Sequence, residues 1–370
     1  MEKEIATRLE QAITEKVFPG AVVGIVRKDG VQQLVTSGHF TYAEDSHLVQ
    51  QDTIFDVASL TKSVVTASLG LSLVERGELN FEDKLIEYLP EFNNSDRENV
   101  LIKHLFTYTI GGYGMGKLTV HDKSPEKLVE YVLTHDFEER PGTVFRYSNV
   151  PAFLLGLAIE RITGETLAQL AEPYFKALDM TRTTFFPEHF AKDEIVPTEI
   201  DEWRGLVQGV VHDESAYVFK TMANRIVGHA GLFSTAPDIL KFMHMLLNNG
   251  TIGNQSYFLP ETVEQMQTNQ IAHLHDYTGL GWELNQPRYM GPLCSPRTFG
   301  KTGFTGCLCV ADIDRNVAFV ILSNRIYPQR PSDSTAINAV RADVADIVFR
   351  SLEEDASFTS LPVSPILTGY

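Results

Sequence analysis

The sequence predicts an α/β (α+β) fold, in which a mostly antiparallel sheet is flanked by N- and C-terminal helices and a mainly helical lobe is inserted. The chain opens with a helix pattern and a hairpin, its middle is mostly helical, and strand patterns joined by short turns return near its end. Short turns join antiparallel neighbours. We therefore expect a sheet domain of residues 1–75 and 280–370, a helical domain of residues 76–279, and a site in the cleft between them.

The first part of the chain contains a helix, a hairpin and a second, buried helix. Apolar residues repeat at helical spacing over residues 3–17. Asp29-Gly30 is a strong hairpin turn between the apolar runs Ala21–Val26 and Val31–Ser37. The segment from Ser59 to Arg76 is apolar on nearly all sides in its central part, which predicts a buried helix.

Further elements follow in the middle and at the end of the chain. Helices are expected from Ser124-Pro125-Glu126, where a capping serine precedes a proline, and over Pro151–Ile162, Thr166–Leu178 and Ser234–Leu247. Strands are expected at Leu280–Leu284, Arg297–Thr302, Leu308–Ile313 and Val317–Ser323. An amphipathic helix over Ala336–Leu352 closes the chain.

The composition excludes several classes of partner. The formal net charge of −17 argues against nucleic acid and against anionic membrane surfaces, because both attract clustered Lys and Arg. No segment has the ~18 consecutive apolar residues that a membrane-spanning helix needs. The N-terminal residues lack the basic and apolar regions of a secretion signal, so we expect a cytoplasmic protein with no membrane span. The three cysteines do not form the pattern of a disulfide framework.

The first candidate for chemistry is Ser59-Leu60-Thr61-Lys62, at the start of the buried helix. Residues three apart lie on one face of a helix, about 5–6 Å apart, so Ser59 and Lys62 can share a hydrogen bond. A serine hydroxyl becomes a nucleophile when a neighbour takes its proton, and a lysine can do so when burial lowers its pKa. The pattern alone is loose, because Ser59 could serve only as the N-cap of the helix.

The second and third candidates are Tyr147-Ser148-Asn149 and Lys301-Thr302-Gly303. A phenolate near lysine cations could accept a proton, and Asn149 could orient an acyl amide or a lysine. Lys301 could hold a substrate carboxylate or tune the pKa of Tyr147. Gly303 lets a ligand approach the strand backbone, which could offer an N–H group to an oxyanion. Taken alone, Tyr147-Ser148-Asn149 is also consistent with a buried tyrosine and a helix cap. Taken alone, Lys301-Thr302-Gly303 is also consistent with a polar strand that contains a glycine bulge.

In this order, the three segments together resemble the motifs of the serine β-lactamase and penicillin-binding-protein superfamily. Tyr147-Ser148-Asn149, in place of Ser-Asp-Asn, is similar to the class C β-lactamase branch, which also holds D-alanyl-D-alanine carboxypeptidases and related esterases. Val211–Glu214 and Gly228–Ser234 also look similar to segments of its esterase-like and peptidase-like members. The resemblance covers nearly the whole chain, from about Phe18 to Leu352.

The resemblance implies a role for each matching side chain. Ser59 would attack a substrate carbonyl, and Lys62 would share protons with it. Tyr147 would act as general base for acylation and as general acid for the leaving group, with Lys301 adding positive charge beside it. Asn149 would orient the substrate and Lys62. Whether Lys62 or Tyr147 is the operative base stays open, because the two can titrate as a coupled pair.

The remaining implied contacts concern the substrate. The backbone N–H groups of Ser59 and Phe304 would form the oxyanion hole, with Thr302 and Gly303 beside them in the substrate-binding site. No metal or organic cofactor is implied. The segment Tyr108-Thr109-Ile110-Gly111 departs from the usual His-Thr-Ser-Gly, and we expect its isoleucine to reshape the cleft wall without touching the proposed catalytic groups.

These motifs predict a serine hydrolase that cleaves an ester or amide through an acyl-Ser59 intermediate. Esterase or D-alanyl-D-alanine peptidase activity ranks above a β-lactamase, and a non-catalytic penicillin-binding-like protein is a further alternative. An α/β-hydrolase is disfavoured because the sequence has no Gly-x-Ser-x-Gly elbow. The expected partner is a small-molecule or peptide substrate with an ester, amide or lactam carbonyl, and the oligomeric state is not predicted.

Overall fold

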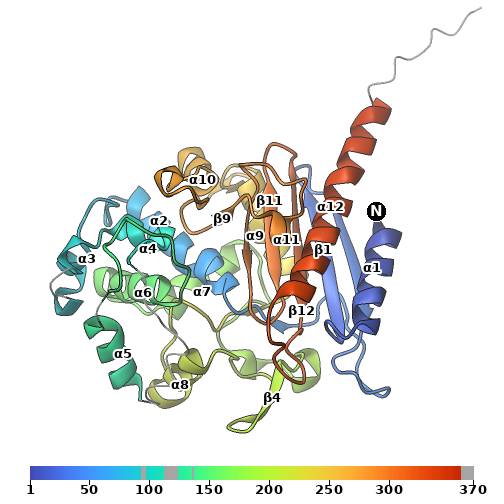
Figure 1. The fold of residues 1–370 in the computed structure, drawn as a ribbon, viewed down its shortest axis with the longest axis horizontal. Helices are drawn as coiled ribbons and strands as arrows, with labels where there is room; N and C mark the ends of the chain where they lie inside the picture. Colours follow the sequence, from blue (N-terminus) through green and yellow to red (C-terminus); the bar gives the residue numbers. More distant parts are fainter. Residues whose placement is uncertain (93–96, 112–123, 136, 360–370) are drawn as a thin grey trace, which may run out of the picture.

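A six-stranded sheet forms the largest element of the computed structural model, which describes residues 1–92, 97–111, 124–135 and 137–359 (Figure 1). The strand order is β2-β1-β12-β11-β10-β9, and every neighbouring pair is antiparallel. The strands are β1 (Gly20–Arg27), β2 (Gln32–Gly38), β9 (Glu283–Leu284), β10 (Phe299–Thr302), β11 (Leu308–Asp312) and β12 (Val317–Ser323). The predicted fold class, a mostly antiparallel sheet with a mainly helical insertion, is confirmed.

Both faces of the sheet are covered by helices, because alternate residues of a strand point to opposite sides. On one face, residues such as Val23 pack against α1 (Glu2–Thr14) and α12 (Thr335–Thr359). On the other face, residues such as Val22 join a core that includes α9 (Ala236–Leu247). The helix α9 therefore packs on the sheet although it lies far from the sheet strands in sequence.

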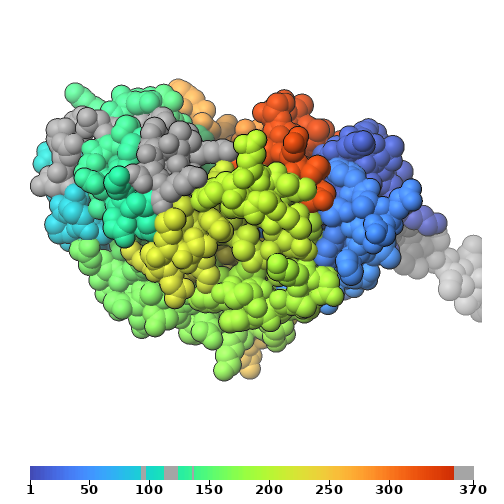
Figure 2. Space-filling model, turned by 90° about the horizontal axis from the view of Figure 1, so that it is seen from below, coloured from blue at the N-terminus to red at the C-terminus, as the bar shows by residue number. Residues whose placement is uncertain are grey.

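Helices are the main regular elements in the described part of the chain between β2 and β10. Within the described ranges they include α2 (Ser68–Glu75), α3 (Leu85–Tyr88), α4 (Ile102–Thr107), α5 (Pro125–Thr134), α6 (Val150–Thr163), α7 (Leu167–Ala177), α8 (Glu214–Ala223), α10 (Pro260–Met266) and α11 (Pro287–Met290). Short strand pairs join β3 (Phe55–Asp56) to β6 (Phe233–Ser234), β4 (Glu199–Asp201) to β5 (Gly205–Val207), and β7 (Thr251–Ile252) to β8 (Gln255–Ser256). Figure 2 shows the segment around β4, β5 and α8, in yellow-green, covering the middle of one face.

The sheet and the helical part share one hydrophobic core. The larger cluster of buried apolar side chains contains Val22 and Val320 from the sheet, Leu240 from α9, and Phe106 and Leu154 from α4 and α6. The walls of the region between the sheet and the helices are therefore fixed by one continuous set of packed side chains.

Residues in the left-handed conformation shorten two of the predicted elements. The first helix ends at Thr14, because Lys16 adopts a φ of 57° that a helix does not tolerate. The strand expected at Leu280–Leu284 is reduced to β9, because Gly281 has a φ of 79° that breaks the extended backbone. The sequence pattern identified both elements but not the residues at which the left-handed conformation ends them.

The buried helix predicted from Ser59 to Arg76 is present and contains one irregular turn. Residues Lys62–Ala67 form a π-helix, η1, which continues directly into α2. A π-helical segment within a helix is rare and often occurs at a functional site. Among the described helices, none has both the length and the apolar character that crossing a membrane requires.

Candidate active site

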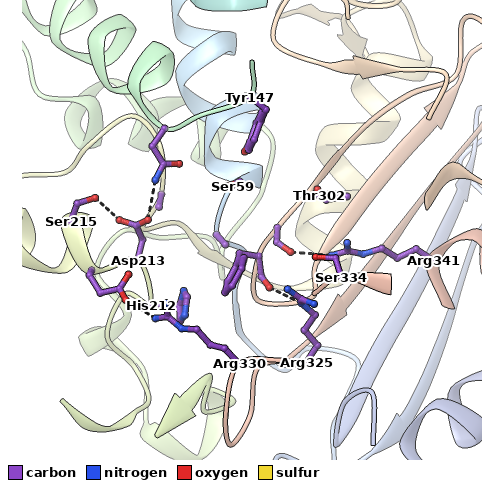
Figure 3. Close-up of a pocket in the computed structure, with 16 residues that line it drawn as sticks. Ser59, Tyr147, His212, Asp213, Ser215, Thr302, Arg325, Arg330, Ser334 and Arg341 are labelled. Carbon is purple, nitrogen blue, oxygen red and sulfur yellow. Dashed lines mark hydrogen bonds and ion pairs between the residues drawn. The ribbon is translucent and has the colours of Figure 1, made fainter. Parts of the chain in front are cut away.

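Ser59 lies in the turn that joins β3 to the buried helix. The Asp56 carboxylate fixes this turn, because it accepts the backbone N–H of Ala58 at 2.8 Å and that of His212 at 2.7 Å. Ala58 adopts a φ of 48°, in the left-handed region that residues other than glycine rarely occupy. Such strained positions are often found at functional sites. The turn presents Ser59 to a pocket at the N-terminal end of a buried helix (Figure 3).

Replacing Asp56 with Ala is expected to destabilise the protein by about 2–5 kcal/mol, because two backbone N–H groups in its buried surroundings lose their acceptor. Asp56 is 1% exposed, so water has little access to replace the carboxylate. Urea-induced unfolding followed by circular dichroism measures the change, with Asp193→Ala at an exposed position as the control. A loss below about 1 kcal/mol would show that the turn does not depend on this side chain.

The Lys62 side chain reaches back to Ser59 from the first residue of η1. Its Nζ donates to Ser59 Oγ at 2.7 Å and to the backbone oxygen of His229 at 2.8 Å. Burial lowers the pKa of Lys62 to about 7, with a further contribution from the positive charge of Lys301 and partial opposition from nearby carboxylates. A lysine with this pKa is partly a neutral amine near neutral pH and can accept a proton.

Tyr147 lies beside the Lys62–Ser59 pair. Its hydroxyl points toward Ser59 (Figure 3), and its ring centre is 5.5 Å from Lys62 Nζ and 4.2 Å from Lys301 Nζ. Although the residue as a whole is 43% exposed, burial around its hydroxyl raises the pKa of Tyr147, and the charge of Lys301 only partly opposes this increase. Tyr147 is therefore a neutral phenol near neutral pH, able to donate a proton.

Lys301 is fully buried and already paired. Its Nζ lies 3.1 Å from Glu283 Oε1 and 3.1 Å from the hydroxyl oxygen of Tyr108. Lys301 does not line the pocket, so it is not placed to hold a substrate carboxylate, which was one of the two roles considered for it. Its charge can instead act on the pKa of Tyr147 and of Lys62.

The segment that departs from His-Thr-Ser-Gly contacts Lys301 through its first residue. Only the isoleucine of this segment was considered in the sequence, but it is the Tyr108 hydroxyl that accepts a hydrogen bond from Lys301. Tyr108 ends α4 with a φ of 56°, and its ring lies 5.0 Å from the Tyr147 ring, centre to centre. The segment therefore shapes the surroundings of both Lys301 and Tyr147.

Asn149 contacts Asp213 rather than the lysine it was expected to orient. Its Nδ2 donates to Asp213 Oδ2 at 3.2 Å, and no Asn149–Lys62 hydrogen bond occurs within the described part of the chain. Asp213 also accepts from Ser215 Oγ at 2.6 Å and lies 3.1 Å from His229 Nε2. Burial alone would raise the pKa of Asp213, but His229 and these donors hold it well below its usual range. Asp213 is therefore an ionised carboxylate in the pocket wall.

These groups surround a pocket of about 360 Å³. Most of the residues singled out in the sequence line it directly, namely Ser59, Tyr147, Asn149, Thr302, Gly303 and Phe304. Lys62 and Lys301 lie behind this lining and act through the hydrogen bonds and ring contacts described above. The structure thus brings together segments that are more than two hundred residues apart in the chain.

The Beta-lactamase family model matches residues 5–342, which is nearly the whole chain. The chain belongs to the beta-lactamase family. It is therefore a serine hydrolase of the β-lactamase and penicillin-binding-protein superfamily, a group that acts on small amide or ester substrates.

Proteins similar to this β-lactamase-family protein carry the names of carboxypeptidases and of a hydrolase. A protein of Escherichia coli (strain K12), provisionally named D-alanyl-D-alanine carboxypeptidase, is 31% identical, with 74% of this chain and 69% of the relative covered. The structure of EstCE1, described as a hydrolase with promiscuous acyltransferase activity, has a TM-score of 0.74 at 20% identity and covers 94% and 98% of the two chains. D-alanine carboxypeptidase AmpC from Burkholderia cenocepacia has a TM-score of 0.69 at 22% identity, with 94% and 98% covered. These two structures share the fold.

Several residues of the β-lactamase-family site were not singled out in the sequence. His212, Asp213 and Glu214, from the segment noted above only for its similarity to family members, line the pocket. Glu283 carried no local signal, because a lone acid has many other uses in a protein, and Tyr108 was named only as part of the segment that departs from His-Thr-Ser-Gly. The arginines Arg325 and Arg341 also line the pocket, and their position follows only from the way the C-terminal strands and helix pack.

Proposed function

We propose that the protein hydrolyses an ester or amide bond through a covalent acyl intermediate on Ser59. The observation that carries this proposal is the 2.7 Å hydrogen bond between Lys62 Nζ and Ser59 Oγ, formed by a buried amine with a pKa of about 7. Such an amine can take the hydroxyl proton as the oxygen attacks. The pair therefore supplies a nucleophile and its base in hydrogen-bond contact.

In the acylating step, Ser59 Oγ bonds to the substrate carbonyl carbon while its proton passes to Lys62. The bond to the alcohol or amine leaving group then breaks, and the leaving group takes a proton from Tyr147, which recovers one from Lys62. Water next attacks the acyl-enzyme, gives a proton to neutral Lys62, and displaces Ser59, to which the proton returns. This proposal makes Lys62 the base, because burial lowers the pKa of the lysine and raises that of the phenol.

The oxyanion hole proposed from the resemblance consists of the backbone N–H groups of Ser59 and Phe304. Both residues line the pocket, and neither N–H donates a hydrogen bond to any residue that the structure describes. Unpaired N–H groups facing a pocket can bind a carbonyl oxygen as negative charge develops on it. This arrangement supports acyl transfer at Ser59.

We propose esterase or D-alanyl-D-alanine peptidase activity ahead of β-lactamase activity. The name of the Escherichia coli relative and the description of EstCE1 support these two activities. A pocket of about 360 Å³ fits a small substrate or the end of a peptide. A β-lactamase remains the second candidate, because the same acyl-serine chemistry opens a lactam.

Intact-protein mass spectrometry tests this proposal. The wild type and Ser59→Ala are exposed separately to a fluorescent penicillin and to p-nitrophenyl acetate, and ester turnover is followed in parallel. A Ser59-dependent penicillin adduct supports a penicillin-recognising peptidase or lactamase, and ester turnover without that adduct supports an esterase. If neither reagent gives a Ser59-dependent adduct and no ester is turned over, the result contradicts the proposal and favours a non-catalytic protein.

The pH dependence of hydrolysis is a further prediction. kcat/KM for a neutral aryl ester is expected to rise with pH and level off above an apparent pKa of about 7, because protonated Lys62 cannot accept a proton. Lys301→Met removes a charge that lowers the pKa of Lys62, so the rise should move to higher pH. Glu283→Gln removes a charge that raises this pKa, so the rise should move to lower pH.

The two variants control for each other in this experiment. Each breaks the same buried Lys301–Glu283 ion pair, so a general disturbance of the site would affect both profiles alike. Rates are measured at constant ionic strength, because salt screens charge interactions. Shifts in the same direction, or a wild-type profile that is flat from about pH 6 to 8, would contradict Lys62 as the base.

A further inference from the structure

The backbone N–H groups of Ser59 and Phe304, the proposed oxyanion donors, lie on two turns that Asp56 connects. The Asp56 carboxylate holds the Ser59 turn by accepting the backbone N–H of Ala58 at 2.8 Å. Its backbone oxygen accepts the hydroxyl of Thr305, the residue after Phe304, at 2.7 Å. Asp56 therefore supports the backbone of the first turn and reaches the second turn at the residue beside its donor.

His212 connects the same two turns by a second route. Its backbone N–H donates to Asp56 Oδ2 at 2.7 Å, on the side of the Ser59 turn. Its imidazole ring stacks on the ring of Phe304, with the ring centres 5.5 Å apart and the planes inclined by 21°. His212 lines the pocket yet is only 4% exposed, so its ring is enclosed in the pocket wall (Figure 3).

The imidazole of His212 is itself held by Glu199, the first residue of β4. Glu199 Oε1 lies 3.2 Å from His212 Nε2. The same carboxylate accepts Arg204 Nη2 at 2.7 Å, and it accepts Nε and Nη2 of Arg330 at 2.6 and 2.7 Å. Burial alone would raise the pKa of Glu199, but Arg330 and His212 hold it below its ordinary value. An ionised, buried carboxylate therefore fixes the place of the imidazole.

The Phe304 ring also meets two guanidinium groups. The central carbon of Arg325 lies 5.1 Å from the ring centre, and that of Arg330 lies 5.7 Å from it. Arg325 Nε also donates to the backbone oxygen of Phe304 at 2.9 Å. Phe304 is 45% exposed, so these directional contacts, rather than deep burial, restrain its ring and the backbone attached to it.

We propose that His212 is a positioning residue for the oxyanion hole. Its backbone is bonded to the support of the Ser59 turn and its ring restrains Phe304, so it fixes the separation of the two N–H groups. Donors stabilise a developing oxyanion best when they are already in place, because no reorganisation is then needed during the reaction. This rests on the proposed function, since it concerns the acyl-transfer step at Ser59.

A pair of oxo and thiono esters tests this proposal. p-Nitrophenyl benzoate is compared with its O-aryl thionobenzoate analogue, in which sulfur replaces the carbonyl oxygen. Sulfur is larger and accepts hydrogen bonds more weakly, so two well-placed N–H groups favour the oxo ester. The measured quantity is the oxo-to-thiono ratio of kcat/KM, after subtraction of the rate with Ser59→Ala and division by the same ratio for hydroxide-catalysed hydrolysis.

His212→Ala is expected to lower kcat/KM for the oxo ester about 10–100-fold, somewhat less than the loss caused by deleting a whole oxyanion donor. The oxo-to-thiono ratio should fall with it, whereas a general loss of structure would slow both esters alike. His212→Phe keeps a ring that can stack and should restore most of the ratio. His189→Ala is the matched control, because it removes a similar stacked pair, with Phe186 at 5.9 Å and 22°, outside the pocket lining.

Phe304→Leu tests the same contact from its other side. This variant keeps the backbone N–H and removes only the aromatic ring, at a position that is 45% exposed, so the fold is expected to tolerate it. Its oxo-to-thiono ratio should fall as in His212→Ala. Thermal unfolding curves identify any variant that fails to fold, and Phe304→Leu decides the question if His212→Ala is one of them.

Three results would overturn this proposal. An unchanged oxo-to-thiono ratio in folded His212→Ala, or in Phe304→Leu, would show that the stacked rings do not place the donors, while the proposed function survives. A ratio in His212→Phe as low as that in His212→Ala would assign the effect to a polar contact of the imidazole. Absence of all Ser59-dependent turnover would contradict the proposed function itself.

Discussion

Ser59→Ala is expected to lower kcat/KM for aryl esters about 10⁴-fold or more, because the variant has no oxygen with which to form the acyl-enzyme. The fold should stay intact. Ser59 Oγ accepts one hydrogen bond, from Lys62, and the turn itself is held by Asp56 through backbone groups. Steady-state kinetics measures the rate, and a thermal unfolding curve checks the fold.

A matched serine variant completes this experiment. Ser72→Ala removes a hydroxyl from α2, the continuation of the same helix, away from the pocket lining. Its activity should stay close to that of the wild type. If Ser59→Ala kept more than about a tenth of the wild-type rate, Ser59 would not be the nucleophile.

Lys62→Met is expected to lower kcat/KM about 10²–10⁴-fold, the usual contribution of a positioned base. The same substitution should stabilise the fold. The pKa of Lys62 is about 7 in the folded protein against an ordinary value of 10.5, so a charged Lys62 costs about 2–5 kcal/mol in its buried position. Methionine fills a similar volume without the charge.

The sign of this stability effect makes it testable. Below pH 7 both the folded and the unfolded protein carry the Lys62 proton, and the full cost of the buried charge is present. As pH rises above 7 the folded protein loses that proton first, so the cost declines until about pH 10.5. Urea unfolding at several pH values should therefore show a gap between Lys62→Met and wild type that narrows as pH rises. The exposed Lys176→Met serves as control, and a gap independent of pH would show that Lys62 is not a buried, perturbed amine.

The parts of the site that could be predicted from sequence depend on local geometry. Ser59 and Lys62 are three residues apart in one helix, and the structure joins their side chains by a hydrogen bond. The position of Thr302 and Gly303 at the end of a strand could be predicted from a short strand pattern, and both residues line the pocket. Such pairings need little knowledge of the rest of the fold.

The remaining parts depend on contacts between distant segments. Asn149 donates to Asp213, 64 residues away, and Lys301 pairs with Glu283 on the neighbouring strand. Neither partner follows from spacing along the chain, because each is set by the packing of separate elements. Arg325 could not be predicted for the same reason, since it joins Ser59 in the pocket lining only through the packing of the segment after β12.

The shared core has a consequence for how substrate reaches Ser59. Val22 from the sheet, Leu240 from α9 and Leu154 from α6 belong to one packed cluster. The sheet side and the helical side of the pocket are therefore not separated by a weakly packed boundary. Packed interiors resist deformation, and hinge motion needs a weakly packed boundary. We therefore expect selection among substrates to rest on the shape and charge of a preformed opening, with side-chain rotation, rather than lobe closure, as the main adjustment.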